Sequence, residues 1–251
     1  MNLFTSFKLH NLRKSPRYQN GVFTLAHQHI KYSDSLSLYH EYKDIFEYKI
    51  YDFSTDNPAP FIIDAGACIG MSILYFKMKY PNAEILAFEP DPQIYQICNE
   101  NISNNNLSKV KLLNSGLGND ETTRVFHPDG LDGGSFFVES AGKGIQKLKM
   151  EKLSKYINRP VDLLKMNIEG SENEVFEDLR PVLHYVKEII FEYHAFYDLN
   201  QTLGNILNIL DQTGFRYLVT DATNAKIPVP FHLSKNYHYF NLVYAKNVKY
   251  I

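Results

Sequence analysis

A turn of small residues between an apolar strand pattern and a helix pattern is the first place where this sequence could do chemistry. The turn reads Asp64-Ala65-Gly66-Ala67-Cys68-Ile69-Gly70. Small residues let a ligand approach the backbone at the start of a helix. A dinucleotide fingerprint would need glycine at Cys68 and Met71, and a P-loop would need a Lys-Ser or Lys-Thr pair after Gly70. The turn therefore predicts a ligand-binding loop of another kind.

Two carboxylates indicate the ligand that this loop would hold. Asp64 ends the first strand, where it would repel a pyrophosphate and suit an ammonium group. Glu89, 25 residues further on and followed by Pro90, has nearly the usual spacing for the acid that accepts both hydroxyls of a ribose. A ribose and an ammonium without phosphates indicate S-adenosylmethionine. The alternative is that Glu89, Pro90 and Asp91 only form an acidic helix N-terminus.

A second group of polar residues follows two later strand patterns. Asn167 and Glu169 end one strand, and Glu192 and His194 end the next. Ligands of an open α/β sheet bind outside the carboxyl ends of its strands, so these side chains are expected to meet there. They could hold a divalent ion through Glu169, Glu192 and His194, or Glu169 or His194 could accept a proton from a hydroxyl. The structural alternative is that Glu169 and Glu172 cap a helix, or that Lys165 pairs with a carboxylate below the edge.

The elements that must position these residues alternate along the chain. Short apolar runs alternate with amphipathic stretches, which is typical of a parallel sheet wound with helices on both faces. Strands are predicted at residues 61–65, 84–89, 110–114, 161–168 and 188–194, and helices at 71–80, 91–104, 172–184 and 200–213. The tail offers two more strands, at 216–220 and 239–245, as an antiparallel pair.

Two further segments fall outside this alternation. Residues 1–54, before a polar stretch with two prolines, predict strands at 21–25 and 29–32 and a helix at 35–46. We interpret them as an N-terminal appendage to a domain at 55–251. A glycine-dense segment at 129–135, flanked by strand patterns at 122–126 and 136–139, predicts an inserted β-hairpin.

Composition limits the function classes. The 251 residues are 44% hydrophobic and carry 26 Lys plus Arg against 28 Asp plus Glu, a net charge of −2. Such a chain buries a large core but has no basic field for nucleic acid. No membrane span or secretory signal pattern is found, and two cysteines suit a reducing compartment, so a soluble cytoplasmic α/β domain is expected.

Over about residues 61–194, the sequence resembles the FkbM-type family of S-adenosylmethionine-dependent methyltransferases. The turn at 64–70 resembles the family's cofactor loop, although an asparagine is usual at Cys68. Phe88-Glu89-Pro90 resembles its ribose-binding strand end. Residues 165–172 resemble its Lys-x-Asp-x-Glu-Gly-x-Glu block, with Asn167 in place of the aspartate, and residues 189–194 resemble its strand that ends in a glutamate.

The resemblance implies a class I, Rossmann-like, doubly wound and mostly parallel seven-stranded sheet that binds S-adenosylmethionine. The implied activity is methyl transfer to a hydroxyl of a sugar, glycan precursor or related natural product. The cofactor-binding candidates are Asp64, Gly66, Ala67, Gly70, Glu89, Pro90 and Ser115, which follows the third strand. The catalytic candidates are Glu169, His194 and Asn167, although an asparagine cannot act as a general base.

The acceptor site is expected to come from elements added to the cofactor-binding scaffold. We expect the glycine-dense segment 129–135 and the aromatic residues Tyr39, Tyr42 and Tyr48 to frame it. Two other functions compete with methyl transfer. One is a nicotinamide-dependent oxidoreductase, and the other is a non-catalytic domain that binds a carbohydrate or a partner protein, an alternative left open by Asn167.

Overall fold

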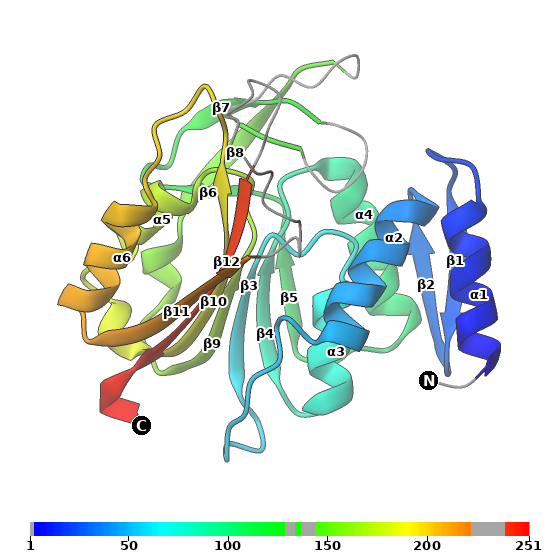
Figure 1. Cartoon of the computed structure of the whole chain (residues 1–251), viewed down its shortest axis with the longest axis horizontal. Helices are drawn as coiled ribbons and strands as arrows, with labels where there is room; N and C mark the ends of the chain where they lie inside the picture. The colour runs from blue at the N-terminus through cyan, green and yellow to red at the C-terminus, as the bar shows by residue number, and fades with distance from the viewer. Residues whose placement is uncertain (1–2, 129–133, 137–143, 222–238, 251) are drawn as a thin grey trace, which may run out of the picture.

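The central strand β3 (Phe61–Ala65) is buried along its whole length. It belongs to a seven-stranded sheet in the order β11-β12-β10-β9-β3-β4-β5. The other strands are β4 (Glu84–Phe88), β5 (Val110–Leu113), β9 (Val161–Met166), β10 (Val186–Ala195), β11 (Phe215–Asp221) and β12 (Tyr239–Asn247). The computed structural model describes residues 3–128, 134–136, 144–221 and 239–250 (Figure 1).

Strand direction within this sheet follows the predicted pattern. Strands β10, β9, β3, β4 and β5 run parallel to one another. Strand β12 runs antiparallel to both β10 and β11. The mostly parallel, doubly wound seven-stranded sheet is therefore confirmed, as is the antiparallel pair at its end.

Helices cover both faces of the sheet, because successive strand residues face opposite sides. Ile62 belongs to the apolar cluster that contains α3 and α4, whereas Ile63 belongs to the cluster that contains α5 and α6. Figure 1 shows these two helical layers with the sheet between them. The helices are α3 (Met71–Lys79), α4 (Pro92–Asn104), α5 (Glu172–Leu179) and α6 (Leu203–Gln212).

Two of these helices are shorter than predicted by more than one residue. Helix α5 was expected to reach residue 184, but it ends at Leu179. Pro181 explains this end, since it cannot continue a helix and disfavours helical geometry in the residue before it. Helix α6 begins at Leu203, three residues later than the predicted start at residue 200.

The N-terminal segment packs on the face covered by α3 and α4. It contains the predicted hairpin β1 (Gly21–Leu25) and β2 (Gln28–Tyr32), the predicted helix α2 (Ser35–Tyr42), and a helix that was not predicted, α1 (Leu3–Lys14). The predicted helix at 35–46 changes to a π-helix over Lys43–Tyr48. The side chain of Asn101 in α4 accepts from the Lys31 N–H through Oδ1 and donates to the Lys31 carbonyl through Nδ2. These two bonds fix β2 against α4. The division at residue 54 stays a prediction.

In the residues that the structure describes, the first strand of the predicted inserted hairpin pairs with a different strand from the one expected. A small sheet contains β6 (Gly116–Gly118), β8 (Gln146–Lys152) and β7 (Thr123–Phe126), with β7 antiparallel to β8. The predicted partner of β7, residues 136–139, lies mostly outside the described residues, as does most of the segment 129–135. An isolated bridge between His127 and Ser135 is present. Strand β8 was missed, although its alternating lysines and apolar residues carry the period of a strand.

The chain order places a switch point at the centre of the sheet. The first half winds outward from β3 through β4 to β5, and the second half returns to β9 on the other side of β3. Loops at the carboxyl ends of β3 and β9 therefore diverge, and ligands of open α/β sheets bind in the crevice that results. Among the described residues, no helix is both long enough and apolar enough to cross a membrane.

Asp162, at the start of β9, links this strand to β3 and β10 at the edge where the parallel strands begin. Its removal should destabilise the fold. Its buried carboxylate accepts from the backbone N–H of Phe61 at 2.9 Å and from Lys187 at 2.8 Å. Asp162→Ala leaves that N–H without its acceptor, so the free energy of unfolding should fall by about 2–4 kcal/mol. Urea unfolding measures this loss. Arg216→Ala, which removes an exposed ion pair with Asp211, should cost at most about 1 kcal/mol. An equal loss in both variants would contradict the role of Asp162.

Candidate active site

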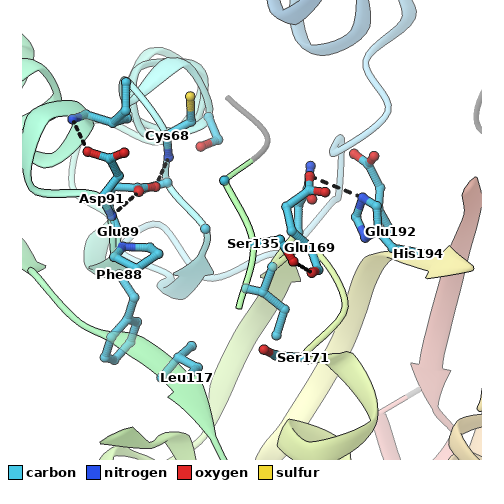
Figure 2. A pocket seen from close by; sticks show the side chains of 18 of the residues that line it. Cys68, Phe88, Glu89, Asp91, Leu117, Ser135, Glu169, Ser171, Glu192 and His194 are labelled. Carbon is cyan, nitrogen blue, oxygen red and sulfur yellow. Dashed lines mark hydrogen bonds and ion pairs between the residues drawn. The ribbon is translucent and has the colours of Figure 1, made fainter. Parts of the chain in front are cut away.

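A pocket of about 600 Å³ opens at the carboxyl ends of β3, β4, β9 and β10. Its wall includes Cys68, Glu89 and Asp91 on one side and Glu169, Glu192 and His194 on the other, as Figure 2 shows. We name these two parts the loop end and the polar end. The sequence predicted both groups, and the structure brings them to one pocket. Gly66, Ala67, Pro90, Ser115 and Asn167 also line it.

The loop after β3 has the tight geometry that its small residues permit. Gly66 and Ala67 both donate to the carbonyl of Phe88, at 3.0 and 2.9 Å, which ties the loop to the end of β4. Gly66 has φ +82°, and a Cβ built on it would lie 1.7 Å from the carbonyl oxygen of Asn167. Gly70, with φ +92°, precedes α3 and does not line the pocket. Gly66 is thus required by the neighbouring backbone, a constraint that the sequence did not indicate.

Glu89 lies at the loop end with both carboxylate oxygens occupied by backbone donors. Oε2 accepts from the N–H of Cys68 at 3.0 Å and Oε1 from the N–H of Asp91 at 2.9 Å. Burial raises the pKa of Glu89 to about 8, the charge of Asp91 adds to the rise, and the two N–H donors oppose it. Asp91 also caps α4 by accepting from Gln93 and Ile94. Glu89 and Asp91 both line the pocket. Asp91 also has the helix-capping role that was the alternative for this segment.

Asp64 does not line the pocket but lies beneath the loop. It is fully buried and forms an ion pair with Lys165 at 2.9 Å, and it accepts from Ser72 Oγ at 2.5 Å. Lys165 also donates to the carbonyl of Gly66. The geometry of Asp64 matches support of the loop and not the contact with a ligand's ammonium group that the sequence suggested. Lys165 pairs with a carboxylate below the sheet edge, as the structural alternative proposed.

At the polar end, His194 lies between two glutamates. Its Nδ1 is 2.8 Å from Oε1 of Glu172, and its Nε2 is 3.3 Å from Oε1 of Glu169. Burial alone would lower the pKa of His194, but the two carboxylates outweigh burial and hold it well above the ordinary value. The two carboxylates therefore favour the protonated imidazole in this arrangement.

Glu169 has a strained backbone, with φ +53°. A residue other than glycine in this region costs about 1–3 kcal/mol, and such residues cluster at functional sites. Gly170 follows with φ +106°, so the chain leaves β9 through two consecutive left-handed residues. Ser135 Oγ donates to the carbonyl of Glu169 at 3.0 Å, which connects the β7–β8 region to this turn. The strain turns the Glu169 side chain toward the pocket that it lines.

Glu192 is paired with a residue that the sequence did not indicate. The hydroxyl of Tyr51 donates a hydrogen bond to the Glu192 carboxylate. Burial, followed by the charge of Glu192, raises the pKa of Tyr51 well above its ordinary value. Burial and Glu192 also raise the pKa of Asp44, which lies in the π-helix. Tyr51 and Asp44 both line the pocket, and no local sequence pattern marks either one.

Three buried polar atoms of the pocket wall have no hydrogen-bond partner among the residues that the structure describes. They are Ser115 Oγ, Asn167 Oδ1 and Ser171 Oγ. A buried polar atom without a partner costs about 1–3 kcal/mol. Ser115 was a predicted cofactor contact and Asn167 a predicted catalytic residue, so both lie where a bound molecule could satisfy them.

Only part of the predicted frame of the acceptor site lines this pocket. Gly134, Ser135 and Phe136, next to or within the glycine-dense segment, line the pocket. Tyr39, Tyr42 and Tyr48 do not, and this prediction was wrong: Tyr42 stacks on Phe46 in the core and Tyr48 is exposed. The residues of the same segment that line the pocket are His40, Glu41, Asp44, Ile45, Ile50 and Tyr51.

The candidate metal ligands are engaged with other side chains. Glu169 and His194 pair with each other, and Glu192 accepts from Tyr51. In the part of the chain that the structure describes, no group of three or more His, Cys, Asp or Glu residues is arranged to hold a metal ion. The polar end is therefore a hydrogen-bonded cluster of carboxylate, imidazole and phenol groups.

Fold and site together define a class I, Rossmann-like methyltransferase fold, with an acidic strand end at β4 and a polar cluster beyond β9 and β10. The sequence profile of the Methyltransferase FkbM domain matches residues 64–217. The chain belongs to the FkbM methyltransferase family. The family resemblance drawn from residues 61–194 is confirmed.

Relatives of known name support this assignment. Methyltransferase sdnD of Sordaria araneosa is 34% identical over 173 residues, covering 54% of this chain and 66% of sdnD. Methyltransferase 1 of Beauveria bassiana is 32% identical over 163 residues, covering 55% of this chain and 66% of the relative. The match thus spans just under two thirds of both relatives. The 2-O-methyltransferase NoeI of Sinorhizobium fredii is 24% identical over 178 residues, covering 62% of this chain and 72% of NoeI.

Solved structures share the fold at low sequence identity. Methyltransferase FkbM from Methylobacillus flagellatus superposes with a TM-score of 0.52 at 14% identity, covering 96% of this chain and 59% of that one. The M. jannaschii TYW2 protein, in complex with AdoMet, gives 0.52 at 13% identity, covering 92% and 87%. Both confirm the predicted class I fold.

Substitution of Gly66 should damage the fold itself. Gly66→Ala combines a positive φ with overlap against the Asn167 carbonyl, each costing about 1–3 kcal/mol, so stability should fall by about 2–6 kcal/mol. Chemical unfolding measures the change. Gly204→Ala is the matched control, because a Cβ on this α6 residue meets nothing within 4 Å, and it should stabilise the protein by about 0.5–1 kcal/mol. A fully stable Gly66→Ala protein would show that the Asn167 backbone can move away.

Proposed function

We propose that this protein is an S-adenosylmethionine-dependent O-methyltransferase that acts on a hydroxyl of a sugar, glycan precursor or related natural product. The observation that carries the proposal is one pocket that joins the Glu89 loop end to the Glu169–His194 polar end. Family membership supports methyl transfer. The name of NoeI supports an oxygen acceptor, and the AdoMet complex of the TYW2 protein supports the cofactor.

The loop end has the donor and acceptor set that S-adenosylmethionine needs. Glu89 offers a carboxylate to ribose hydroxyls, and the unpartnered Ser115 Oγ offers a further polar contact. The apolar side chains of Ile94 and Leu117 line the same part of the wall and suit a flat base. When bound, the cofactor supplies an electrophilic methyl group on a sulfonium centre.

The polar end orients the acceptor and takes its proton. Glu169 lines the pocket, and its carboxylate is held by the protonated imidazole of His194 at 3.3 Å. A hydroxyl bound beside Glu169 can donate its hydrogen bond to this carboxylate and transfer the proton as the oxygen is alkylated. Orientation of the two reactants contributes about 7–11 kcal/mol to such reactions, so proton acceptance adds to an effect that is mainly positional.

Mass spectrometry tests the activity directly. Purified protein, donor carrying a labelled methyl group and a panel of glycosides should give a product heavier by one labelled methyl group in place of hydrogen. Incubation with the glycosides but without donor is the control. Cofactor binding without any product would favour the non-catalytic carbohydrate-binding alternative. The nicotinamide-dependent alternative conflicts with membership of a methyltransferase family.

Removal of the Glu89 carboxylate should weaken cofactor binding and abolish its pH dependence. Glu89→Gln should raise the Kd for S-adenosylmethionine about 10- to 100-fold, the loss expected from charge-assisted hydrogen bonds. Ribose hydroxyls favour the charged carboxylate, whose pKa is raised to about 8 in the free protein. Wild-type affinity should therefore increase as pH rises from about 6 toward 8 and then level off.

Isothermal titration calorimetry at several pH values measures both effects of Glu89. The Gln variant should show no such pH dependence, and thermal unfolding confirms that it is folded. Unchanged affinity in the folded variant would remove Glu89 from the cofactor site. A wild-type affinity that falls as pH rises would contradict the proton linkage.

Glu169→Gln tests proton acceptance at the polar end. The amide keeps the size of the side chain but cannot take a proton, so kcat should fall by about 10²–10⁴-fold while cofactor Kd changes little. Steady-state kinetics and calorimetry separate these quantities. Full activity in Glu169→Gln would leave only a structural role for this residue. Recovery of the variant in excess divalent cation would instead indicate a metal ligand.

A further inference from the structure

Glu172 supports the polar end from outside the pocket. It is the first residue of α5, and its side chain is almost completely buried. Its Oε1 lies 2.8 Å from His194 Nδ1 and also accepts from the Gly170 N–H at 3.1 Å. Glu172 is not part of the pocket wall, whereas His194 and Glu169 are. The three side chains therefore form a series, Glu172 to His194 to Glu169, that runs from the protein interior to the pocket.

The imidazole of His194 is held on several sides. Phe196 lies nearly parallel to it with ring centroids 6.1 Å apart, and Phe240 contacts it edge-on at 5.1 Å. The aromatic contacts restrict the ring plane, and the bond to Glu172 decides which ring nitrogen points inward. Nε2 is thereby directed to Glu169. A carboxylate on one imidazole nitrogen commonly fixes the ring orientation and the group bound at the other nitrogen.

Helix capping alone does not require a buried carboxylate at this position. Taking a carboxylate out of water costs several kcal/mol, which a neutral amide at the same position would avoid while still accepting from Gly170. The charge is matched by the His194 imidazolium, whose other neighbour is the pocket residue Glu169. The carboxylate of Glu172 therefore matches the imidazole of His194, whereas the helix end would need only a neutral acceptor.

We propose that Glu172 is a positioning residue that holds His194 so that Nε2 fixes the Glu169 carboxylate at the acceptor. This inference rests on the proposed methyltransferase function and adds a residue to it. In the reaction the acceptor oxygen gains the methyl group and its proton passes to Glu169. The sulfonium of the donor becomes a neutral thioether, and His194 keeps both ring protons. Glu172 exchanges no proton.

A double-mutant cycle separates positioning from a structural role. Glu172→Gln should lower kcat by about 10- to 100-fold, the usual cost of losing the partner of a site histidine, with little change in cofactor Kd. In a His194→Gln background the same change should have little further effect, because Glu172 acts through His194. Glu174→Gln is the matched control: it removes another acid of the first α5 turn, which pairs with Arg124 outside the pocket, and should keep kcat. Additive losses of kcat in the cycle would overturn the proposal.

NMR of isotope-labelled histidine gives a readout that needs no turnover. Wild-type His194 should show a slowly exchanging Nδ1 proton, and this signal should disappear or move strongly in Glu172→Gln but not in Glu174→Gln. An unchanged His194 signal in Glu172→Gln would overturn the proposal. If Glu172→Gln does not fold, Glu172→Asp takes its place in both measurements. A wild-type protein that methylates no glycoside would defeat the proposed function alone, since the NMR result still decides whether Glu172 orients His194.

Discussion

The ion pair between Asp64 and Lys165 is the interaction on which the pocket depends. The two residues are opposite each other on β3 and β9, the strands that flank the switch point of the sheet. Both are buried, and Lys165 also binds the carbonyl of Gly66. Loss of one partner of such a pair leaves a buried charge and costs about 3–5 kcal/mol, although an intact pair adds little net stability. Its main effect is geometric, because it fixes two strands and the loop above them together.

The same pair connects the two ends of the pocket. Ser72 of α3 donates to Asp64 on the loop side. On the other side the Lys165 ammonium lies 5.1 Å from the ring centre of Tyr51, whose hydroxyl binds Glu192. A continuous series of polar contacts therefore runs from the start of α3 to the end of β10, with Asp64 buried beneath the loop and Tyr51 and Glu192 in the pocket wall. One network positions the loop end and the polar end, although their residues come from distant parts of the sequence.

The sequence was sufficient for features that depend on local pattern. Buried parallel strands are continuous apolar runs, and the strand, turn and helix around Gly66 have a strong local signal, so the sheet and the loop end were predicted. The polar end followed from topology, since Glu169 and His194 end neighbouring strands. The pairing of His194 with Glu172 did not follow, because it depends on how α5 packs beside β10. The constraint that the Asn167 backbone places on Gly66 did not follow either, because only the paired strands bring these two residues close.

Errors in the N-terminal segment have a different origin. Helix α2 is regular through Tyr42, and it presents His40 and Glu41 to the pocket while Tyr42 packs in the core, so the expected tyrosines lie on another side of the helix. The π-helix that follows from Lys43 contributes Asp44 to the pocket wall. Like the left-handed Glu169, this irregularity costs local stability and is retained beside the pocket. Both irregular segments place a carboxylate in the pocket wall, Asp44 from the π-helix and Glu169 from the turn after β9. The acidic groups of the pocket therefore come from departures from regular geometry as well as from the regular strand β10, which carries Glu192.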